Sequence, residues 1–442
     1  MRPLRVSKTI PGPRSRTLAA RLRRYESRNV TFVSPQFPIF WKKSRGSNVW
    51  DVDGNRYLDM TSGFGVSSLG FNAPVIVSAL RTQSKQLLHV MGDVHPSALK
   101  ADLCQELSRV TFERWGAGRA KVILGNSGFE AVEAALKTSL LATGRRGILA
   151  FEGGYHGLGL GSLETTGWPV FRTPFCKMLG GFCSFHPYPR GDDQDMQQAE
   201  KSVLRLVRSR GIGAVLVEPV LGRGGHVVPP EWFLPMLRRV CDQEAILLIF
   251  DEIYTGFGKT GRMFACEGAE GTVVPDLICL GKALTGGFPL SACVGRADLM
   301  DRAWPESSGE ALHTSTYLGH PVGCAMARAS IRAIHRPGLL KSVAHKGGYF
   351  LGLLRRELDA VPRVAGIHGK GLLLGIEMKQ PGTGHPDPEG CTRVMIESLQ
   401  QGLIVLGGGL QGNVLSLTPV FGVTETEMKC AAFILHKIMK GL

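Results

Sequence analysis

Two short apolar runs in the middle of the chain constrain its fold more than any other feature. The first, Ala245 to Phe250, ends abruptly at Asp251, and the second, Leu277 to Leu280, ends at Gly281 and Lys282. Short apolar runs bounded by turn signals are typical of buried strands in a parallel sheet. Because ligands of such sheets bind beyond the carboxyl ends of the strands, we expect Asp251 and Lys282 to lie at a binding site.

This acid and this amine suit the chemistry of pyridoxal phosphate. A lysine can hold that cofactor as a Schiff base, while an aspartate keeps the pyridine nitrogen protonated. Taken separately, each residue is more often a solvated charge that caps a strand. The pair, together with the motifs around it, favours the cofactor.

The composition is that of a large globular protein with a basic surface. The chain has 442 residues, of which 43% are hydrophobic, and this is enough for two domains. It carries 52 Lys and Arg against 37 Asp and Glu, a formal charge of +15. Since the positive charges are spread thinly and aromatic residues do not alternate with them, we expect a surface that attracts anionic substrates rather than nucleic acid. No apolar run approaches the roughly 18 residues of a membrane span, so a membrane partner is not expected.

The cysteines indicate a reducing compartment. None of the 10 cysteines forms a CxxC pair, and several lie inside apolar runs. We therefore predict buried, reduced thiols, no metal site and a cytoplasmic location. The arginine-rich N-terminus has some features of a transit peptide, but it lacks serine richness and contains the proline-rich stretch IPGPRSR, which favours the cytoplasm.

The segment KVILGNSGFEAVEAALK predicts a strand, a turn and then a helix. Ser127 is a plausible N-cap, and Glu130 completes a capping box. The buried stripe of this helix is expected at Phe129, Val132, Leu136 and Leu140. A helix that starts directly after a strand offers free N–H groups to an anion, although an ordinary capped helix is the alternative.

Strands continue to alternate with helices as far as Thr285, which predicts a doubly wound, mostly parallel sheet. Beyond that residue the pattern changes to a polar loop, a helix from about Pro321 and strand-like segments, typical of a separate α+β domain. The expected division is an N-terminal segment that joins the small domain (1–72), a large cofactor domain (73–320) and a C-terminal small domain (321–442).

Seven motifs follow one another along nearly the whole chain. They are WDVDGNRYLD, NSGFEAVEAALK, FEGGYHG, VEPV, FDEIYTGFGKTG, PDLICLGKALTGGFPLSA and STYLGHP. In this order they give the chain a specific resemblance to the class III aminotransferases, pyridoxal-phosphate-dependent enzymes of the aspartate aminotransferase fold (fold type I). The resemblance implies an α/β large domain with a mostly parallel, doubly wound sheet, and a small α+β domain built from both chain ends.

The resemblance also assigns roles to residues of the motifs. Lys282 would bind the cofactor covalently and move the proton between substrate and cofactor, while Asp251 would keep the ring nitrogen cationic. Ser127 and Gly128 would hold the phosphate, and Tyr155 and Ile253 would pack on the two faces of the ring. Glu218 would order the site by hydrogen bonding.

Thr316 and His156 are two further residues of the motifs. Thr316 would reach the phosphate of the partner's cofactor, which makes a homodimer with shared active sites obligatory. The alternative for Thr316 is a hydroxyl that caps the helix after Pro321. His156 is expected to be a satisfied structural histidine, since nothing places it against a reacting proton.

Departures from the family pattern bear on the substrate. Tyr254 stands where the family usually has a glutamine that touches the cofactor's phenolic oxygen. The family's carboxylate-binding arginine and its partner glutamate correspond here to Ser416 and Arg223. We hypothesise that Arg223 binds a substrate carboxylate, because its planar fork matches that group. A surface arginine in a glycine-rich loop is the alternative.

The resemblance implies a ping-pong transamination with pyridoxal 5'-phosphate. The amino group would pass from an ω-amino acid, amine or amino acid donor to a 2-oxo acid, both of them small molecules. An amino-acid racemase or epimerase of the same family is the alternative, and no residue in the sequence separates the two. A basic nucleic-acid-binding protein that has lost catalysis is a third possibility, and the retained pair Lys282 and Asp251 opposes it.

Overall fold

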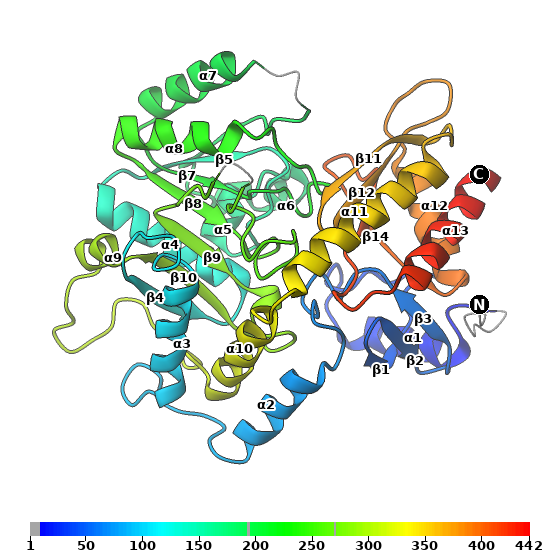
Figure 1. Cartoon of the computed structure of the whole chain (residues 1–442), viewed down its shortest axis with the longest axis horizontal. Helices are drawn as coiled ribbons and strands as arrows, with labels where there is room; N and C mark the ends of the chain where they lie inside the picture. The colour runs from blue at the N-terminus through cyan, green and yellow to red at the C-terminus, as the bar shows by residue number, and fades with distance from the viewer. Residues whose placement is uncertain (1–8, 192–194, 269–270) are drawn as a thin grey trace. The chain divides into compact units, whose positions relative to one another are not determined.

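The computed structural model describes residues 9–191, 195–268 and 271–442, which form two compact units (Figure 1). One unit is Pro74–Ala344, here called the central unit. The other combines the segment up to Ala73 with His345–Leu442 and is called the second unit. Helix α10 (Pro321–Ile334) belongs to the central unit, whereas the boundary expected from the sequence falls just before it. The eight N-terminal residues of the basic opening segment lie outside the described residues.

A seven-stranded sheet organises the central unit, with the strand order β4-β10-β9-β8-β7-β5-β6. Neighbouring strands from β9 to β6 are parallel, and only β10 runs antiparallel to both of its neighbours. The predicted α/β architecture with a mostly parallel sheet is therefore confirmed. The strands are β4 (Ala120–Gly125), β5 (Gly147–Phe151), β6 (Cys183–His186), β7 (Ile212–Val217), β8 (Leu247–Asp251), β9 (Leu277–Leu280) and β10 (Ser291–Arg296).

The strands at the centre of this sheet are continuous apolar runs because both of their faces are covered. Every residue of β7, β8 and β9 is buried, as expected for a parallel sheet between layers of helices. Helix α4 (Gly128–Thr143) packs against β9 and β10, and α8 (Phe233–Glu244) packs against β8. The remaining helices of the unit are α2 (Pro74–Ser84), α3 (Ala98–Val110), α5 (Leu160–Thr165), α6 (Pro169–Arg172), η1 (Thr173–Met178), α7 (Met196–Ser209), η2 (Lys282–Leu284) and α9 (Ala297–Ala303).

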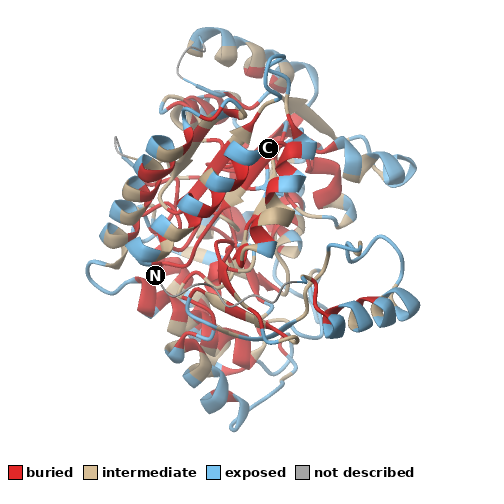
Figure 2. Cartoon of the chain, turned by 90° about the vertical axis from the view of Figure 1, so that its right-hand side faces the viewer, coloured by how far each residue is buried: buried red, intermediate tan, exposed pale blue. Residues whose placement is uncertain are grey.

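The buried stripe predicted for α4 is only half correct. Val132 and Leu136 are buried, but Phe129 and Leu140 are 38% and 48% exposed. The face of α4 that meets the sheet is instead completed by alanines, Ala131, Ala134 and Ala135. Small side chains on this face let the helix lie close to the strands, where larger aliphatic residues of the sheet complete the core. The burial view shows this interior of strands and inner helix faces in red (Figure 2).

The second unit contains two four-stranded sheets. One has the order β1-β2-β3-β13, and the other has the order β11-β12-β15-β14. Strands β2 and β3 pair antiparallel as a hairpin, and Gly54 in its turn has a φ of +92° that suits glycine. The elements are α1 (Pro13–Tyr25), β1 (Trp41–Arg45), β2 (Asn48–Asp51), β3 (Arg56–Asp59), β11 (Val364–Lys370), β12 (Leu373–Met378), α12 (Pro388–Gln400), β13 (Leu403–Ile404), β14 (Leu406–Gly408), β15 (Val414–Leu417) and α13 (Glu425–Gly441).

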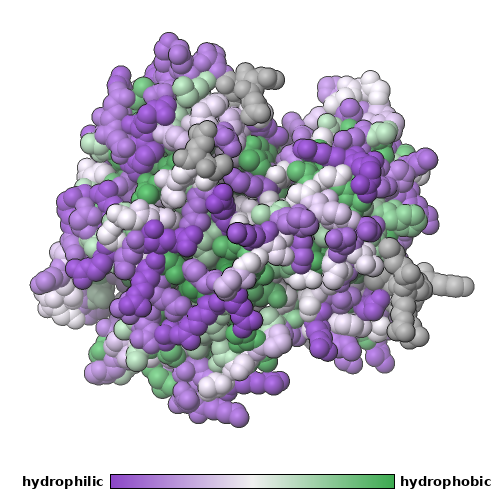
Figure 3. Space-filling view, in the orientation of Figure 1, coloured by the Kyte–Doolittle hydropathy of each residue, from purple (hydrophilic) through white to green (hydrophobic). Residues whose placement is uncertain are grey.

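Helix α11 (Leu339–Leu358) spans the boundary between the two units. On the face drawn in the space-filling view, hydrophilic residues predominate and hydrophobic residues are scattered between them (Figure 3). Within the described ranges, no helix combines the length and the apolar character that crossing a bilayer requires.

Candidate active site

The carboxyl ends of strands β4, β5, β7, β8 and β9 meet at one edge of the central sheet. Strands β5, β7, β8 and β9 are parallel, and β4 points the same way because β10 is antiparallel to both β4 and β9. The predicted cofactor residues follow these strands in turn: Ser127, Tyr155, Glu218, Asp251 and Lys282. The topology therefore gathers at one sheet edge residues that lie far apart in the sequence.

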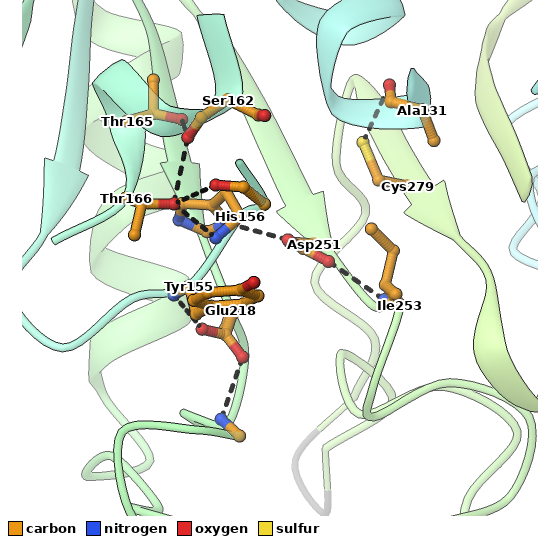
Figure 4. Close-up of polar contacts among 12 residues, drawn as sticks. Ala131, Tyr155, His156, Ser162, Thr165, Thr166, Glu218, Asp251, Ile253 and Cys279 are labelled. Atoms are coloured by element: carbon orange, nitrogen blue, oxygen red, sulfur yellow. Dashed lines mark hydrogen bonds and ion pairs between the residues drawn. The ribbon is translucent and has the colours of Figure 1, made fainter. Parts of the chain in front are cut away.

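Asp251, the last residue of β8, forms a buried pair with His156. The two residues are 3% and 2% exposed, and His156 Nδ1 lies 2.8 Å from Asp251 Oδ2 (Figure 4). The other carboxylate oxygen, Oδ1, accepts a 3.0 Å hydrogen bond from the N–H of Ile253, and Thr166 Oγ1 accepts one from the backbone N–H of His156. His156 is thus satisfied, as we expected, but its partner is the aspartate of the site, whose orientation it fixes.

Glu218 joins two loops of the site through its carboxylate. It is 4% exposed, and Oε1 accepts a hydrogen bond of 2.8 Å from the N–H of Tyr155 (Figure 4). Oε2 accepts a bond of 2.9 Å from the N–H of Gly222. Burial and the nearby charge of Asp251 raise the pKa of Glu218 to about 7. The sequence-based interpretation of Glu218 as an ordering residue agrees with these bonds.

Lys282 begins η2 directly after β9, and its backbone is left-handed with a φ of +41°. Its Nζ lies 4.3 Å from the centre of the Tyr254 ring. Burial lowers the pKa of Lys282, the negative charges of Asp251 and Glu218 oppose this shift, and the positive charge of Arg223 adds to it. A lowered pKa leaves more of the amine neutral, and the neutral amine is the form that attacks a carbonyl carbon.

Tyr254 is held tightly on the side of the Gly222 loop. A Cβ on Gly222 would approach Tyr254 Cδ1 to 2.2 Å, so only glycine leaves room for the ring. The ring of His226 lies 5.8 Å from that of Tyr254. The face of Tyr254 that meets Lys282 is therefore fixed by its surroundings.

The start of α4 fits a phosphate group. Ser127 is the N-cap, as predicted, and its backbone N–H donates to Glu130 Oε2. The hydroxyl oxygen of Ser127 is buried and has no hydrogen-bond partner among the described residues, so it is available to a ligand. Free N–H groups and a free hydroxyl at a helix N-terminus form a site for an anion.

Ile253 fits the ring of a flat cofactor bound beside this phosphate site. A Cβ on Gly128 would come within 3.1 Å of Ile253 Cδ1, and a Cβ on Gly281 would come within 3.2 Å of its Cγ2. Glycine at these two positions, where α4 and η2 begin, lets Ile253 pack directly against the backbone. The residues present are thus compatible with a phosphorylated aromatic aldehyde that reaches Lys282.

Arg223 contacts the site through Tyr155, whereas Thr316 lies apart from it. Arg223 is exposed, and its guanidinium lies against aromatic side chains, with its Cζ 4.9 Å from the ring centre of Tyr155. Thr316 is exposed in the loop before α10, whose N-cap is His320, so the alternative of a helix cap does not describe it. The structure brings together the other predicted site residues but not Thr316.

Sequence reasoning missed two aromatic residues near Arg223. Trp168 lies just before α6 and Phe171 lies in it. Their ring centres are 5.6 and 4.9 Å, respectively, from Arg223 Cζ. No periodic pattern or motif marks this short segment. Its one signal is the concentration of aromatic residues downstream of the FEGGYHG motif.

The lysine, the buried aspartate at the neighbouring strand end and the helix N-terminus fit the requirements of a pyridoxal-phosphate-dependent enzyme. The fold agrees: the ornithine aminotransferase of Toxoplasma gondii, a structure described with pyridoxal phosphate at its active site, superposes with a TM-score of 0.80. It is 28% identical, and the match covers 96% of this chain and 94% of that one.

The sequence profile of the Aminotransferase class-III family matches residues 31–439, so the chain belongs to the class III aminotransferases. It is 33% identical to the 4-aminobutyrate aminotransferase of Mycobacterium leprae, over 97% of this chain and 96% of the relative. It is 32% identical to the 5-aminovalerate aminotransferase DavT of Pseudomonas aeruginosa, over 97% of this chain and 100% of the relative. The protein is a pyridoxal-phosphate-dependent aminotransferase of fold type I.

Proposed function

We propose that this enzyme moves the amino group of an ω-amino acid or a related amine to a 2-oxo acid by a ping-pong mechanism. The observation that carries the proposal is the position of Lys282 at the same sheet edge as the buried pair of Asp251 and His156. The names of the relatives from Mycobacterium leprae and Pseudomonas aeruginosa, which refer to 4-aminobutyrate and 5-aminovalerate, support an ω-amino acid as donor.

Each residue of the buried pair has a defined task in this reaction. Pyridoxal phosphate, when bound, supplies the electron sink that makes a C–H bond beside the substrate nitrogen acidic. Asp251 would lie next to the ring nitrogen, and its negative charge would favour the protonated form. His156 keeps Oδ2 of Asp251 in place at 2.8 Å. Lys282 Nζ would take the proton from the substrate carbon and deliver it to the cofactor carbon, for which its lowered pKa is suitable.

The remaining residues orient the cofactor. Ser127 and Gly128 hold the phosphate at the start of α4, where the Ser127 hydroxyl is free to donate. Tyr155 and Ile253 would pack on the two faces of the ring. Glu218 supports one of these residues, because it fixes the backbone of Tyr155.

The proposal includes a homodimer in which Thr316 reaches the phosphate site of the partner subunit. The loop that carries Thr316 lies against the segment around residue 92, as the 2.7 Å hydrogen bond from Thr314 Oγ1 to Asp93 Oδ2 indicates. These two segments carry several exposed apolar side chains, an arrangement that favours an interface. They are Leu88, Met91, Val94, Leu312 and Tyr317, which are 56–71% exposed.

We place the enzyme in the cytoplasm. Cys279 and Cys293 face each other on the paired strands β9 and β10, yet both are free thiols, as are the other cysteines of the chain. The lack of any CxxC pair and the burial of six of the cysteines support a reducing compartment.

The first test is a spectrum of the purified protein followed by a panel of donors. The holoenzyme should absorb as a lysine-bound pyridoxal phosphate, and Lys282→Ala should not. Incubation with ω-amino acids, simple amines and α-amino acids should then consume pyruvate or 2-oxoglutarate. A protein that shows no cofactor absorbance after addition of pyridoxal phosphate, or a Lys282→Ala variant of normal activity, would overturn the proposal.

A second measurement separates transfer from racemisation. A chiral amino acid is added without any oxo acid. A racemase removes the optical rotation over many turnovers, whereas a transaminase stops after one amino group per site. Loss of rotation beyond one equivalent would favour the racemase.

A further inference from the structure

The guanidinium of Arg223 is surrounded by aromatic rings. Its Cζ lies 4.9 Å from the ring centres of Tyr155 and Phe171, and 5.6 Å from that of Trp168. The indole of Trp168 is itself fixed, since Nε1 donates a 2.9 Å hydrogen bond to the carbonyl oxygen of Gly153. A cation held on ring faces loses little conformational freedom when it later binds a ligand. We call Tyr155, Trp168 and Phe171 the aromatic cage.

The conformation of the backbone on both sides of Arg223 is also restricted. A Cβ on Gly224 would lie 2.7 Å from the carbonyl oxygen of Gly153, and a Cβ on Gly222 would overlap the ring of Tyr254. Gly225 has a φ of +111°, and its N–H closes a turn onto the carbonyl of Gly222. Arg223 is thus the one side chain that this tight turn carries between two glycines, and the turn determines where it points.

Glu218 ties the arginine to the wall of its cage. Its two carboxylate oxygens accept the N–H of Tyr155 and the N–H of Gly222, the residue before Arg223. One buried carboxylate therefore fixes the ring and the arginine that lies against it. An ordinary surface arginine has no such support.

The donor groups of Arg223 remain available in this arrangement. Among the residues that the structure describes, none forms a hydrogen bond or an ion pair with its guanidinium. The rings occupy positions beside the guanidinium but accept no hydrogen bond, so its N–H groups stay free for a planar, bidentate acceptor. The turn that carries Arg223 is linked to the reacting amine through Tyr254, since Gly222 packs against the Tyr254 ring and Lys282 Nζ lies 4.3 Å from the centre of that ring.

We propose that Arg223, oriented by the aromatic cage and by Glu218, binds the carboxylate of the substrate and so selects substrates that carry an acid group besides the reacting nitrogen or oxo group. This inference rests on the proposed function and adds the class of substrate to it. A carboxylate matches the guanidinium because two parallel N–H···O bonds form in one plane. Neutral amines lack that group and gain nothing from Arg223.

Binding to the apoenzyme tests Arg223 without any turnover. The probe is glutarate, measured by isothermal titration calorimetry, with the neutral glutaramide as comparison. Arg223→Gln should weaken glutarate binding about 10- to 100-fold, as expected for lost hydrogen bonds to a charged group, and should leave glutaramide unchanged. The matched control is Arg302→Gln, at an exposed arginine on α9, which should bind as the parent does.

The cage has its own test. Phe171→Leu keeps Arg223 but removes one wall, so glutarate binding should weaken less than in Arg223→Gln. Arg223→Lys keeps the charge without the planar fork and should not restore the parental affinity. Equal glutarate binding by parent and Arg223→Gln would overturn the inference, and so would full recovery in Arg223→Lys.

Kinetics of the holoenzyme separate this inference from the proposed function. Arg223→Gln should lower the ratio of kcat/KM for 4-aminobutyrate to kcat/KM for 1-butylamine about 10- to 100-fold, a ratio that cancels any common effect of the lost charge on Lys282. If the parent enzyme transaminates both donors and Arg223→Gln treats them alike, the proposed function stands and the carboxylate role of Arg223 is wrong. If the parent transaminates no donor, the proposed function is wrong, and glutarate binding to the apoenzyme still decides the role of Arg223.

Discussion

Replacing Glu252 by glutamine should release the loop that follows Asp251. Glu252 is fully buried, and its carboxylate accepts hydrogen bonds from the Thr255 hydroxyl, from Ala265 N–H at 2.9 Å and from Cys266 N–H at 2.8 Å. Oε2 accepts from the Thr255 hydroxyl and Ala265 N–H, and Oε1 accepts from Cys266 N–H. In either orientation, the NH₂ group of a glutamine would therefore face at least one of these backbone N–H groups. One buried donor without an acceptor should lower the free energy of unfolding by about 1–3 kcal/mol.

Hydrogen exchange of the apoenzyme locates this effect. The amides of Ala265 and Cys266 should exchange about 5- to 150-fold faster in Glu252→Gln if the same free energy appears as local opening. Urea unfolding should show the matching loss of stability. The control Glu306→Gln, at an exposed glutamate, should change stability by less than about 0.5 kcal/mol. Unchanged exchange and unchanged unfolding in Glu252→Gln would refute the reasoning.

Three further predictions concern the cofactor residues. Ser127→Ala should weaken pyridoxal phosphate binding about 5- to 10-fold in a cofactor titration, because the buried hydroxyl has no partner among the described residues, and should lower the apoenzyme's free energy of unfolding by no more than the roughly 0.5–2 kcal/mol of a lost helix N-cap. The lowered pKa of Lys282 means that its amine loses its proton at a lower pH than a surface lysine does. Acetylation of the apoenzyme, measured by mass spectrometry, should therefore begin at a lower pH at Lys282 than at Lys341. Identical pH profiles at the two lysines would contradict this. Thr316→Ala should weaken cofactor binding, and mixing it with Lys282→Ala should restore parental affinity at one site of the mixed dimer, whereas no recovery would exclude a shared site.

The positions of the main site residues could be predicted because they follow buried strands. A continuous apolar run such as Leu247–Phe250 marks a strand covered on both faces, and the polar residue that follows it must emerge at the sheet edge. Asp251 and Lys282 were predicted in this way, and the edge at which they meet is the one observed. The positions of these two residues can therefore be predicted from the strand pattern alone.

The rest depends on tertiary contacts that leave no local pattern. The partner of His156 could not be predicted, because a histidine in a loop looks the same whether it bonds to a carbonyl or to Asp251. The exposure of Phe129 was missed because the face of α4 that meets the sheet is made of alanines, which weigh little in a hydrophobic pattern. Trp168 and Phe171 lie on a segment too short for periodicity to show.

The backbone at Lys282 shows what the chemistry demands of the fold. Lys282 has a φ of +41°, a left-handed backbone conformation that costs most L-residues about 1–3 kcal/mol. Glycine or asparagine would adopt the same conformation with less strain. Lys282→Gly should therefore yield an inactive chain whose turn after β9 is more relaxed than the parent's. Selection for heat resistance alone would favour the loss of this lysine, so engineering of a more robust enzyme must screen for turnover at every round.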